Sequence, residues 1–189
     1  MSETCLFLFI ACFLFAANVM GETEYCHRLF TIWERYHDSE YMVYCSSKPR
    51  THRYAREKCR SFGGALASIH GDDENDFVHD LIQRTVKGKT FAWIGLRSWG
   101  NDWDWSDLTL YRYNRFGDDE PHIKYKDDYC AAVTPSNKRW SGLSCNGGLV
   151  HAYVCRKFCG EFTSDEKEKC EKDKTRPFEA GNGPDKEKL

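Results

Sequence analysis

One stretch of the chain gathers acidic side chains closely enough to hold a metal ion. Its carboxylates are Asp118, Asp119, Glu120, Asp127 and Asp128. Carboxylate oxygens are ligands that calcium prefers, so a weak calcium site is one interpretation and a solvated acidic loop is the other. His122 beside Glu120 could bind a transition metal, but no second nitrogen or sulfur ligand accompanies it. The residue types therefore favour calcium over a transition metal.

Three aromatic side chains lie in the same region outside any regular pattern. Trp99, Tyr111 and Tyr113 belong to residues 97–128, a stretch with isolated aromatics, Gly, Asn, Asp and Pro and no clear periodicity. A loop of that length in a compact domain is usually functional. The three rings could stack on a sugar or enter a partner's pocket, or they could pack the loop onto the domain.

No enzyme motif accompanies these residues. The sequence has no G-x-S-x-G motif and no Gly-rich phosphate loop, and its seven histidines have no catalytic motif around them. We therefore expect a binding protein that is not an enzyme, with a hydrolase or toxin of unrecognised site as the alternative. The net charge of −2 gives no electrostatic case for nucleic-acid binding.

The N-terminal segment predicts export. Residues 5–17 form an uninterrupted apolar run, which suits a signal peptide and is too short to span a bilayer. A signal peptide over residues 1–21 predicts a secreted, extracellular protein without a membrane span, and a retained anchor is the alternative. Eight of the ten cysteines then remain, and an even number in an oxidising compartment indicates disulfides.

Composition divides the exported chain into two parts. Residues 22–158 hold all six tryptophans and can build a core. Residues 159–189 are charged and hold few apolar side chains, so burial cannot offset the chain entropy that folding would cost. We expect one packed domain over 22–158 and a disordered tail over 159–189, in which residues 164–174 could form a short helix.

Local patterns in the packed part predict two helices followed by strands. Thr51 is the predicted N-cap of the first helix, and Gly63 and Gly64 end it. Asp72 is the predicted cap of the second helix, which carries apolar residues at helical spacing. The predicted strands are residues 41–45, 91–96, 129–134, 139–143 and 151–157. Four of the six tryptophans are expected in the core, and they are Trp93, Trp103, Trp105 and Trp140.

Short motifs over residues 41–158 occur in an order that resembles the C-type lectin-like domain family. The first group is Ala55-x3-Cys59-x3-Gly63-Gly64-x-Leu66-Ala67-x-Ile69, Glu74-Asn75-Asp76-Phe77 and Trp93-Ile94-Gly95-Leu96. The second group is Trp103-x-Trp105-x-Asp107, Gly117-x2-Glu120-Pro121, Cys130, Trp140-x4-Cys145 and Cys155. The resemblance extends to Cys26 if the chain has the N-terminal hairpin of longer members.

The resemblance implies an α+β double-loop fold, with two helices, antiparallel sheets and a long irregular loop. The disulfides that it implies are Cys59–Cys155 and Cys130–Cys145, with Cys26–Cys45 as in long-form members and Cys159–Cys170 as the pair that then remains. His52 replaces the tryptophan that is usual in the first helix of the family. We expect His52 to be a packed or surface residue that binds no ligand.

The family's sugar site is where this sequence departs from the pattern. Sugar-binding members hold calcium with Glu-Pro-Asn, a carboxylate before the third core cysteine, and Trp-Asn-Asp, and two sugar hydroxyls complete the coordination. Glu120 and Pro121 match this set, but His122 stands at the Asn position. Ser141 and Gly142 stand where the second Asn and the Asp belong. Calcium needs six to eight oxygen ligands, so the resemblance implies a weakened site.

These residues together predict a secreted recognition module that binds an extracellular glycan or protein through its long loop. The candidate ligand-binding residues are Trp99, Tyr111, Tyr113, Glu120, His122 and Asp128. We expect no cofactor and no calcium-dependent sugar site. The alternative is a calcium-dependent lectin with a divergent Glu-Pro-His site, in which Glu120, Asp127 and Asp128 would hold the ion.

Overall fold

The structure is a computed structural model of the chain. It describes residues 25–27, 30–88, 90–99, 102–117, 128–134, 136–148 and 150–159. The expected signal peptide over 1–21 and all but the first residue of the expected tail lie outside the described residues. The described residues up to Phe158 form one compact unit.

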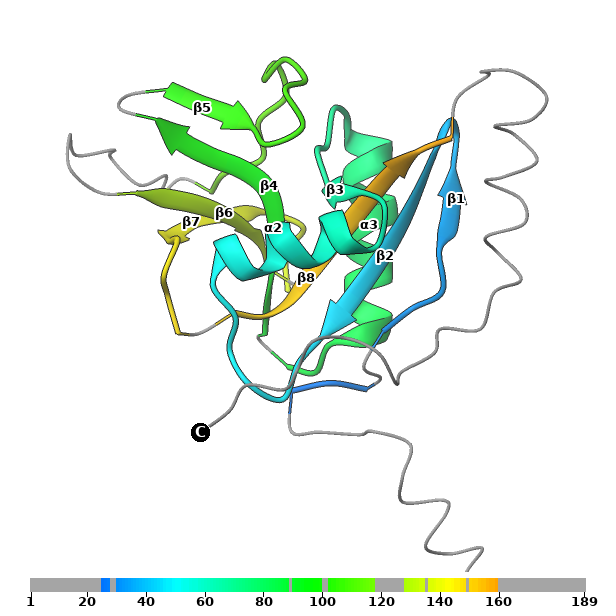
Figure 1. The fold of residues 1–189 in the computed structure, drawn as a ribbon, viewed down its shortest axis with the longest axis vertical. Helices are drawn as coiled ribbons and strands as arrows, with labels where there is room; N and C mark the ends of the chain where they lie inside the picture. Colours follow the sequence, from blue (N-terminus) through cyan, green and yellow to red (C-terminus); the bar gives the residue numbers. More distant parts are fainter. Residues whose placement is uncertain are drawn as a thin grey trace, which may run out of the picture. The chain divides into compact units, whose positions relative to one another are not determined.

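Within the described residues, eight strands form one sheet (Figure 1). The strands are β1 Glu34–Tyr36, β2 Ser39–Cys45, β3 Ala65–Leu66, β4 Phe91–Trp99, β5 Asp102–Trp105, β6 Tyr129–Val133, β7 Trp140–Ser144 and β8 Val150–Phe158. The main order is β1-β2-β8-β4-β6-β7, and β3 pairs with β8 while β5 pairs with β4. The pairing of β4 with β8 is parallel, and the other pairings are antiparallel.

Helix α2, His52–Ser61, begins and ends where the sequence predicts. The amide N–H of Tyr54 donates to the Thr51 hydroxyl at 3.1 Å, which satisfies one of the free amides of the first turn. Gly63 has φ of 79°, a left-handed conformation that glycine adopts without the cost that other residues meet. The amide of Gly64 returns to the Cys59 carbonyl at 3.0 Å and closes the end of the helix.

Helix α3, Asp72–Thr85, differs from the prediction at its start. The N-cap is Gly71, and its backbone makes the turn without any side-chain cap. Asp72 is the first helical residue, so the predicted capping role is wrong; its carboxylate instead accepts a hydrogen bond from Tyr113. No helix in the described part of the chain is long and apolar enough to cross a membrane.

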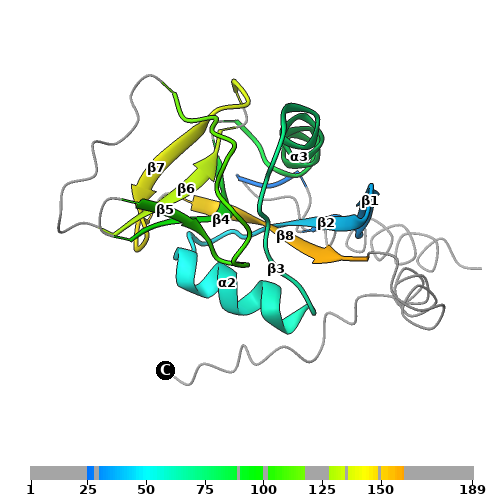
Figure 2. The ribbon, with the colours of Figure 1, turned by 90° about the horizontal axis from the view of Figure 1, so that it is seen from above.

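The two helices lie on opposite faces of β2 and β8 (Figure 2). The side chains of β2 contact the two helices in alternation, because successive side chains of a strand point to opposite faces of the sheet. Tyr41 and Val43 belong to the cluster that contains the α3 side chains. Met42 belongs to the cluster that contains Ala55 and Cys59 of α2. Both faces of the central strands are therefore buried, as in a domain built of two packed layers around a sheet.

The region predicted as a loop over 97–128 is partly regular. β4 continues to Trp99, and β5 pairs with it in antiparallel register, so the irregular loop begins at residue 106. Trp103 and Trp105 alternate with exposed Asp102 and Asp104 along β5. The four tryptophans expected in the core are buried, and they are Trp93, Trp103, Trp105 and Trp140.

Three disulfides join described cysteines. They are Cys26–Cys45, Cys59–Cys155 and Cys130–Cys145, the pairs that the resemblance implies. Cys59–Cys155 ties α2 to β8, and Cys130–Cys145 ties β6 to the end of β7. Cys159 is also disulfide-bonded. Cys170 lies outside the described residues, so Cys159–Cys170 stays a prediction.

Candidate functional site

The described part of the long loop, residues 106–117, is held at both ends by polar contacts. Near its start, Asp107 accepts a hydrogen bond from the Ser68 hydroxyl and another from the Thr109 amide at 3.1 Å. Near its end, the Tyr113 hydroxyl donates to Asp72 at 2.8 Å, and Arg115 pairs with the same carboxylate at 3.3 Å. The first turn of α3 therefore fixes the path of the loop.

Two of the three candidate aromatics in the loop also pack on the core. The Tyr111 ring lies edge-on to Trp105 at 6.4 Å between centroids, and the Tyr113 ring lies edge-on to Trp140 at 5.7 Å. Burial, together with the hydrogen bond to Asp72, raises the pKa of Tyr113. Both side chains are half-buried, so each packs the loop onto the domain and leaves part of its ring exposed.

Two aliphatic side chains on this loop were not predicted as site residues, and both are exposed. Leu108 is 93% exposed and Leu110 is 66% exposed, although large aliphatic side chains are usually buried. Leu108 also has φ of 66°, a conformation that non-glycine residues rarely adopt. The signal in the sequence was two leucines at alternate positions of a polar loop, directly before Tyr111. The pair adds an apolar surface beside the candidate aromatics.

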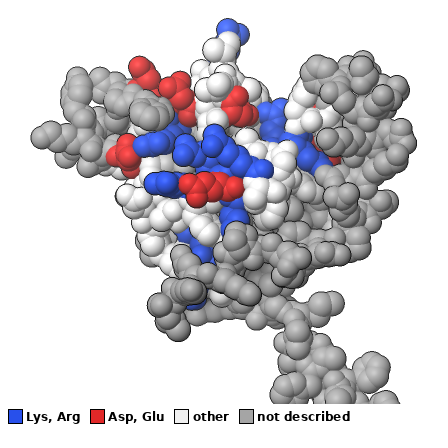
Figure 3. All heavy atoms as spheres, viewed as in Figure 1, with Lys and Arg blue, Asp and Glu red and all other residues white. Residues whose placement is uncertain are grey.

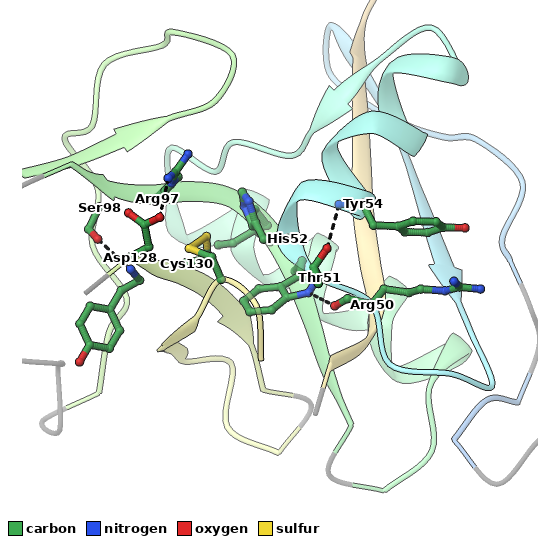
Figure 4. The surroundings of a disulfide bond; sticks show 12 residues. Arg50, Thr51, His52, Tyr54, Arg97, Ser98, Asp128 and Cys130 are labelled. Atoms are coloured by element: carbon green, nitrogen blue, oxygen red, sulfur yellow. Dashed lines mark hydrogen bonds and ion pairs between the residues drawn. A yellow bond between two sulfur atoms is a disulfide. The ribbon is translucent and has the colours of Figure 1, made fainter. Parts of the chain in front are cut away.

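Asp128 is the candidate calcium ligand that the structure describes. Its carboxylate is paired with an arginine side chain of β4. Antiparallel pairing of β4 and β6 places Arg97 opposite Cys130, two residues from Asp128. Arg97 Nη2 donates to Asp128 Oδ2 at 2.8 Å (Figure 4). The Arg97 side chain is 25% exposed and the Asp128 side chain 62%, so solvent screens this pair in part. A calcium ion at this carboxylate would have to compete with the guanidinium.

β7 is the strand in which sugar-binding members of the family have two calcium ligands. In this chain it provides few side-chain oxygen atoms for an ion. Ser141 and Gly142 lie within β7, where they pair with Ala132 and Ala131 of β6. Strand pairing uses their backbone groups, and the Ser141 hydroxyl is the one side-chain oxygen that the two positions provide. Among described residues, no three His, Cys, Asp or Glu side chains gather as a metal site would require.

The other candidate residues lie wholly or partly outside the described part of the chain. Glu120, His122 and Asp127 lie outside the described residues. The backbone of Trp99 ends β4 beside Asp102, and its side chain is outside the described part. The structure thus packs Tyr111 against Trp105 and Tyr113 against Trp140 and Asp72, and it pairs Asp128, the residue before β6, with Arg97 of β4.

Comparison with known proteins identifies this arrangement of helices, sheet and long loop. The sequence model of the C-type lectin domain matches residues 48–157, more than half of the chain. The protein belongs to the C-type lectin domain family. The members that it matches are binding proteins, and this C-type lectin domain is accordingly not an enzyme.

Individual relatives resemble the C-type lectin domain to a moderate degree. Dromaiocalcin-1 of Dromaius novaehollandiae is 34% identical over 110 residues, which cover 55% of this chain and 74% of the relative. Snaclec B1 of Macrovipera lebetinus is 28% identical over 128 residues, which cover 66% and 78%. A solved calcium-independent type II antifreeze protein is 25% identical with a TM-score of 0.56, over 70% of this chain and 98% of that one. The expected family and fold are therefore confirmed.

His52 of the C-type lectin domain is a packed histidine, as expected. Its ring is buried, lies edge-on to Trp93 at 5.5 Å, and forms a 2.9 Å hydrogen bond between Nε2 and the Ile94 carbonyl. Because the carbonyl only accepts, Nε2 carries the proton of the neutral ring. Burial lowers the pKa of His52 to about 4, with the hydrogen bond to Ile94 opposing the shift and the charges of Arg56 and Arg97 adding to it.

The lowered pKa of His52 predicts loss of stability in acid. The pKa of histidine in the unfolded state is near 6.5. Below that pH the unfolded state binds a proton, whereas the folded state binds one only near pH 4. We expect the free energy of unfolding to fall by about 2 kcal/mol between pH 7 and about pH 5 through this residue alone. Urea unfolding of His52→Gln measures the effect, because glutamine can still donate to Ile94 and does not titrate. An unchanged pH dependence in this variant would contradict the assignment.

Proposed function

We propose that the protein is a recognition module that binds a protein or carbohydrate ligand through its long loop without the calcium-dependent sugar site of the family. The observation that carries this proposal is the ion pair between Arg97 and Asp128. It neutralises a carboxylate that calcium coordination would need. Ser141 and Gly142 support the same conclusion, because they offer one hydroxyl where the family offers an amide oxygen and a carboxylate.

One protein of known structure with the same fold agrees with this proposal. The antifreeze protein is described as calcium-independent, so the fold can serve a function without the ion. We extend that property to this chain because its calcium ligands are reduced in number and charge. Glu120 and His122 then act as polar contacts of the loop and are not required as metal ligands.

The loop surface supplies the contacts of the proposed site. Leu108 and Leu110 are exposed on a backbone that Asp107 and Tyr113 hold in place. A fixed backbone lowers the entropy that binding must offset, and clustered apolar and aromatic side chains supply most of the energy at protein interfaces. Trp99 and the exposed parts of Tyr111 and Tyr113 are the aromatic members of the proposed surface.

We propose that this ligand is extracellular. The disulfides of the described domain support secretion, because disulfides persist in oxidising compartments and are rare in the cytosol. The apolar run over residues 5–17 supports the same conclusion. The corresponding partners are glycans and proteins of the cell surface or extracellular fluid.

Ligand binding by the long loop is expected to survive removal of calcium. Binding to a glycan array and to a panel of extracellular proteins, each probed in calcium and in EDTA, measures this. The variant Leu108→Ser with Leu110→Ser should weaken every interaction by about tenfold or more, since two exposed leucines that become buried contribute about 1.5–3 kcal/mol each. These two positions are preferable to Tyr111 and Tyr113, whose loss would also loosen the packing of the loop.

The matched control for the leucine variant is Ile32→Ser. Ile32 is 76% exposed, precedes β1, and lies outside residues 106–117 of the loop. We expect Ile32→Ser to leave binding unchanged. Binding that disappears in EDTA, or that Ile32→Ser weakens as much as the leucine variant, would contradict the proposal.

A further inference from the structure

Helix α2 places three of its basic residues, Arg53, Arg56 and Arg60, on one face by their i, i+3 and i+7 spacing, in a chain whose net charge is −2. The basic residues of the helix are Arg53, Arg56, Lys58 and Arg60. Glu57 is its one acidic residue. Figure 3 shows a band of Lys and Arg side chains on the front face, where α2 lies in Figure 1. The charge of this face is therefore opposite in sign to that of the whole chain.

A pocket of about 340 Å³ opens at one end of this face. It lies where the first two turns of α2 meet the end of β4, the residue before β6 and the turn after β7. The side chains that line it are His52, Arg53, Arg56, Glu57, Arg97, Asp128, Cys145 and Asn146. The Cys130–Cys145 disulfide and the hydrogen bond from the His52 amide to the Cys145 carbonyl at 2.9 Å hold two of its walls together.

The ion pairs inside the pocket leave one guanidinium in excess. Arg53 Nε pairs with Glu57 at 3.0 Å, and Arg97 pairs with Asp128 at 2.8 Å. His52 is neutral at pH 7, since its pKa is lowered to about 4. Arg56 therefore supplies the charge that no lining carboxylate offsets. The pocket as a whole carries about one positive charge, from three guanidinium groups and two carboxylates.

Arg56 also carries a donor that the protein leaves unused. Its Nε is buried and has no hydrogen-bond partner among the residues that the structure describes. Buried polar atoms are nearly always hydrogen-bonded, because an unmade bond costs the desolvation of the group. Arg56 Nε is thus a buried nitrogen of a positively charged group, and it has no acceptor among the described residues. The guanidinium that lines the pocket therefore has no protein acceptor at this nitrogen and no lining carboxylate of its own, and an anion in the pocket would pair with its charge.

From these observations we infer that the pocket binds the sulfate ester of a sulfated carbohydrate, with Arg56 donating to the sulfate oxygens and Arg53 and Arg97 beside it. Guanidinium groups bind such oxygens through paired N–H donors. This site is separate from the apolar loop surface of the proposed function and does not depend on it.

The charge of the pocket decides between sulfate and phosphate. A sulfate ester carries one negative charge, whereas a phosphate monoester carries about −1.5 to −2 at pH 7. Glu57 and Asp128 lie in the same pocket and would repel the additional charge. A single excess positive charge therefore matches the monoanion.

The polarity of the lining decides between a sugar and a sulfated aromatic side chain. Glu57, Asp128 and Asn146 offer hydrogen-bond acceptors and an amide donor to hydroxyl groups. No side chain of the lining presents a large apolar surface on which a ring such as that of sulfotyrosine would pack. Sugar hydroxyls next to the sulfate fit these groups.

The test is a titration of the ¹⁵N-labelled full chain with galactose-6-sulfate, followed by amide chemical shifts. We expect saturable shifts at His52, Arg56, Arg97 and Asn146, with Kd in the range of about 1–10 mM for this single sulfated sugar. Unsulfated galactose should cause no shifts at these residues. Galactose-6-phosphate should bind more weakly by about threefold or more. Glucuronic acid tests whether a carboxylate suffices, and we expect weaker binding for it as well.

Two variants on α2 separate the pocket from general attraction to a basic helix. Arg56→Gln should weaken galactose-6-sulfate binding by about tenfold, since hydrogen bonds to charged groups contribute about 1.5–3 kcal/mol. Arg60→Gln removes the same charge from an exposed position outside the lining, and it should change Kd by less than about twofold. Leu108→Ser with Leu110→Ser should have no effect, which keeps this site distinct from the loop.

Several results would overturn the inference. Equal weakening by Arg56→Gln and Arg60→Gln would mean diffuse electrostatic attraction without a pocket site. Tighter binding of galactose-6-phosphate or glucuronic acid than of the sulfated sugar would show that the charge argument is wrong. Absence of shifts at the lining residues up to about 20 mM would show that the pocket does not bind the sulfated sugar.

Discussion

Replacement of Cys59 and Cys155 by alanine is expected to lower the free energy of unfolding by about 4–5 kcal/mol. The bond spans 96 residues, and in the chain-entropy model long closed loops restrict the unfolded chain most. Both cysteines are fully buried between α2 and β8, so their loss also removes packing of the helix on the sheet. Urea unfolding of the double variant measures the change.

Cys130–Cys145 provides the matched control, because it closes a loop of only 15 residues. Its removal should cost about 3 kcal/mol in the same model, roughly 1–2 kcal/mol less than removal of Cys59–Cys155. A larger loss for the short loop than for the long one would contradict the role of chain entropy.

Much of the fold was predictable because its signals are local. Thr51 as a cap, the glycines after α2 and the apolar spacing in α3 each act within one or two turns of chain. The strands from β6 to β8 follow from short apolar runs between turn residues. β5 was missed because a strand of four residues, in which Trp103 and Trp105 alternate with aspartates, is too short for its periodicity to be distinguished from isolated aromatics.

The contacts that define the candidate site were not predictable, because they join residues far apart in the sequence. Asp128 was identified as a candidate ligand, but its pairing with Arg97 depends on the register of β4 against β6, and that register needs the folded sheet. The basic residues of α2 are evident in the sequence, yet a pocket forms only where β4 and Asn146 meet them.

A buried ion pair in the sheet also joins residues that are far apart in the sequence. Glu40 is fully buried in β2, where alternation alone gives no reason for an acidic residue. Its cross-strand neighbour in β8 is Lys157, whose Nζ lies 3.1 Å from Glu40 Oε2 and over the Trp33 ring at 4.6 Å. Opposite charges paired across two strands offset part of the cost of burial. Only the register of β2 against β8 reveals this partner.

Calcium titration by calorimetry tests the central claim, that recognition here does not use the family's calcium site. The variant His122→Asn with Ser141→Asn and Gly142→Asp rebuilds the family's ligand set around Glu120, and it should bind calcium with Kd in the range of about 1 mM to 1 μM. It should also melt at a higher temperature in calcium, since an ion that binds only the folded state stabilises that state. Adding Arg97→Gln should tighten binding further, because Asp128 is then released from its ion pair.

The unmodified protein is the decisive sample in that titration. Our account predicts no measurable heat of calcium binding up to about 1 mM, while the rebuilt variant serves as the positive control. Tight calcium binding by the unmodified protein that Glu120→Ala abolishes would contradict the account and identify a calcium-dependent lectin.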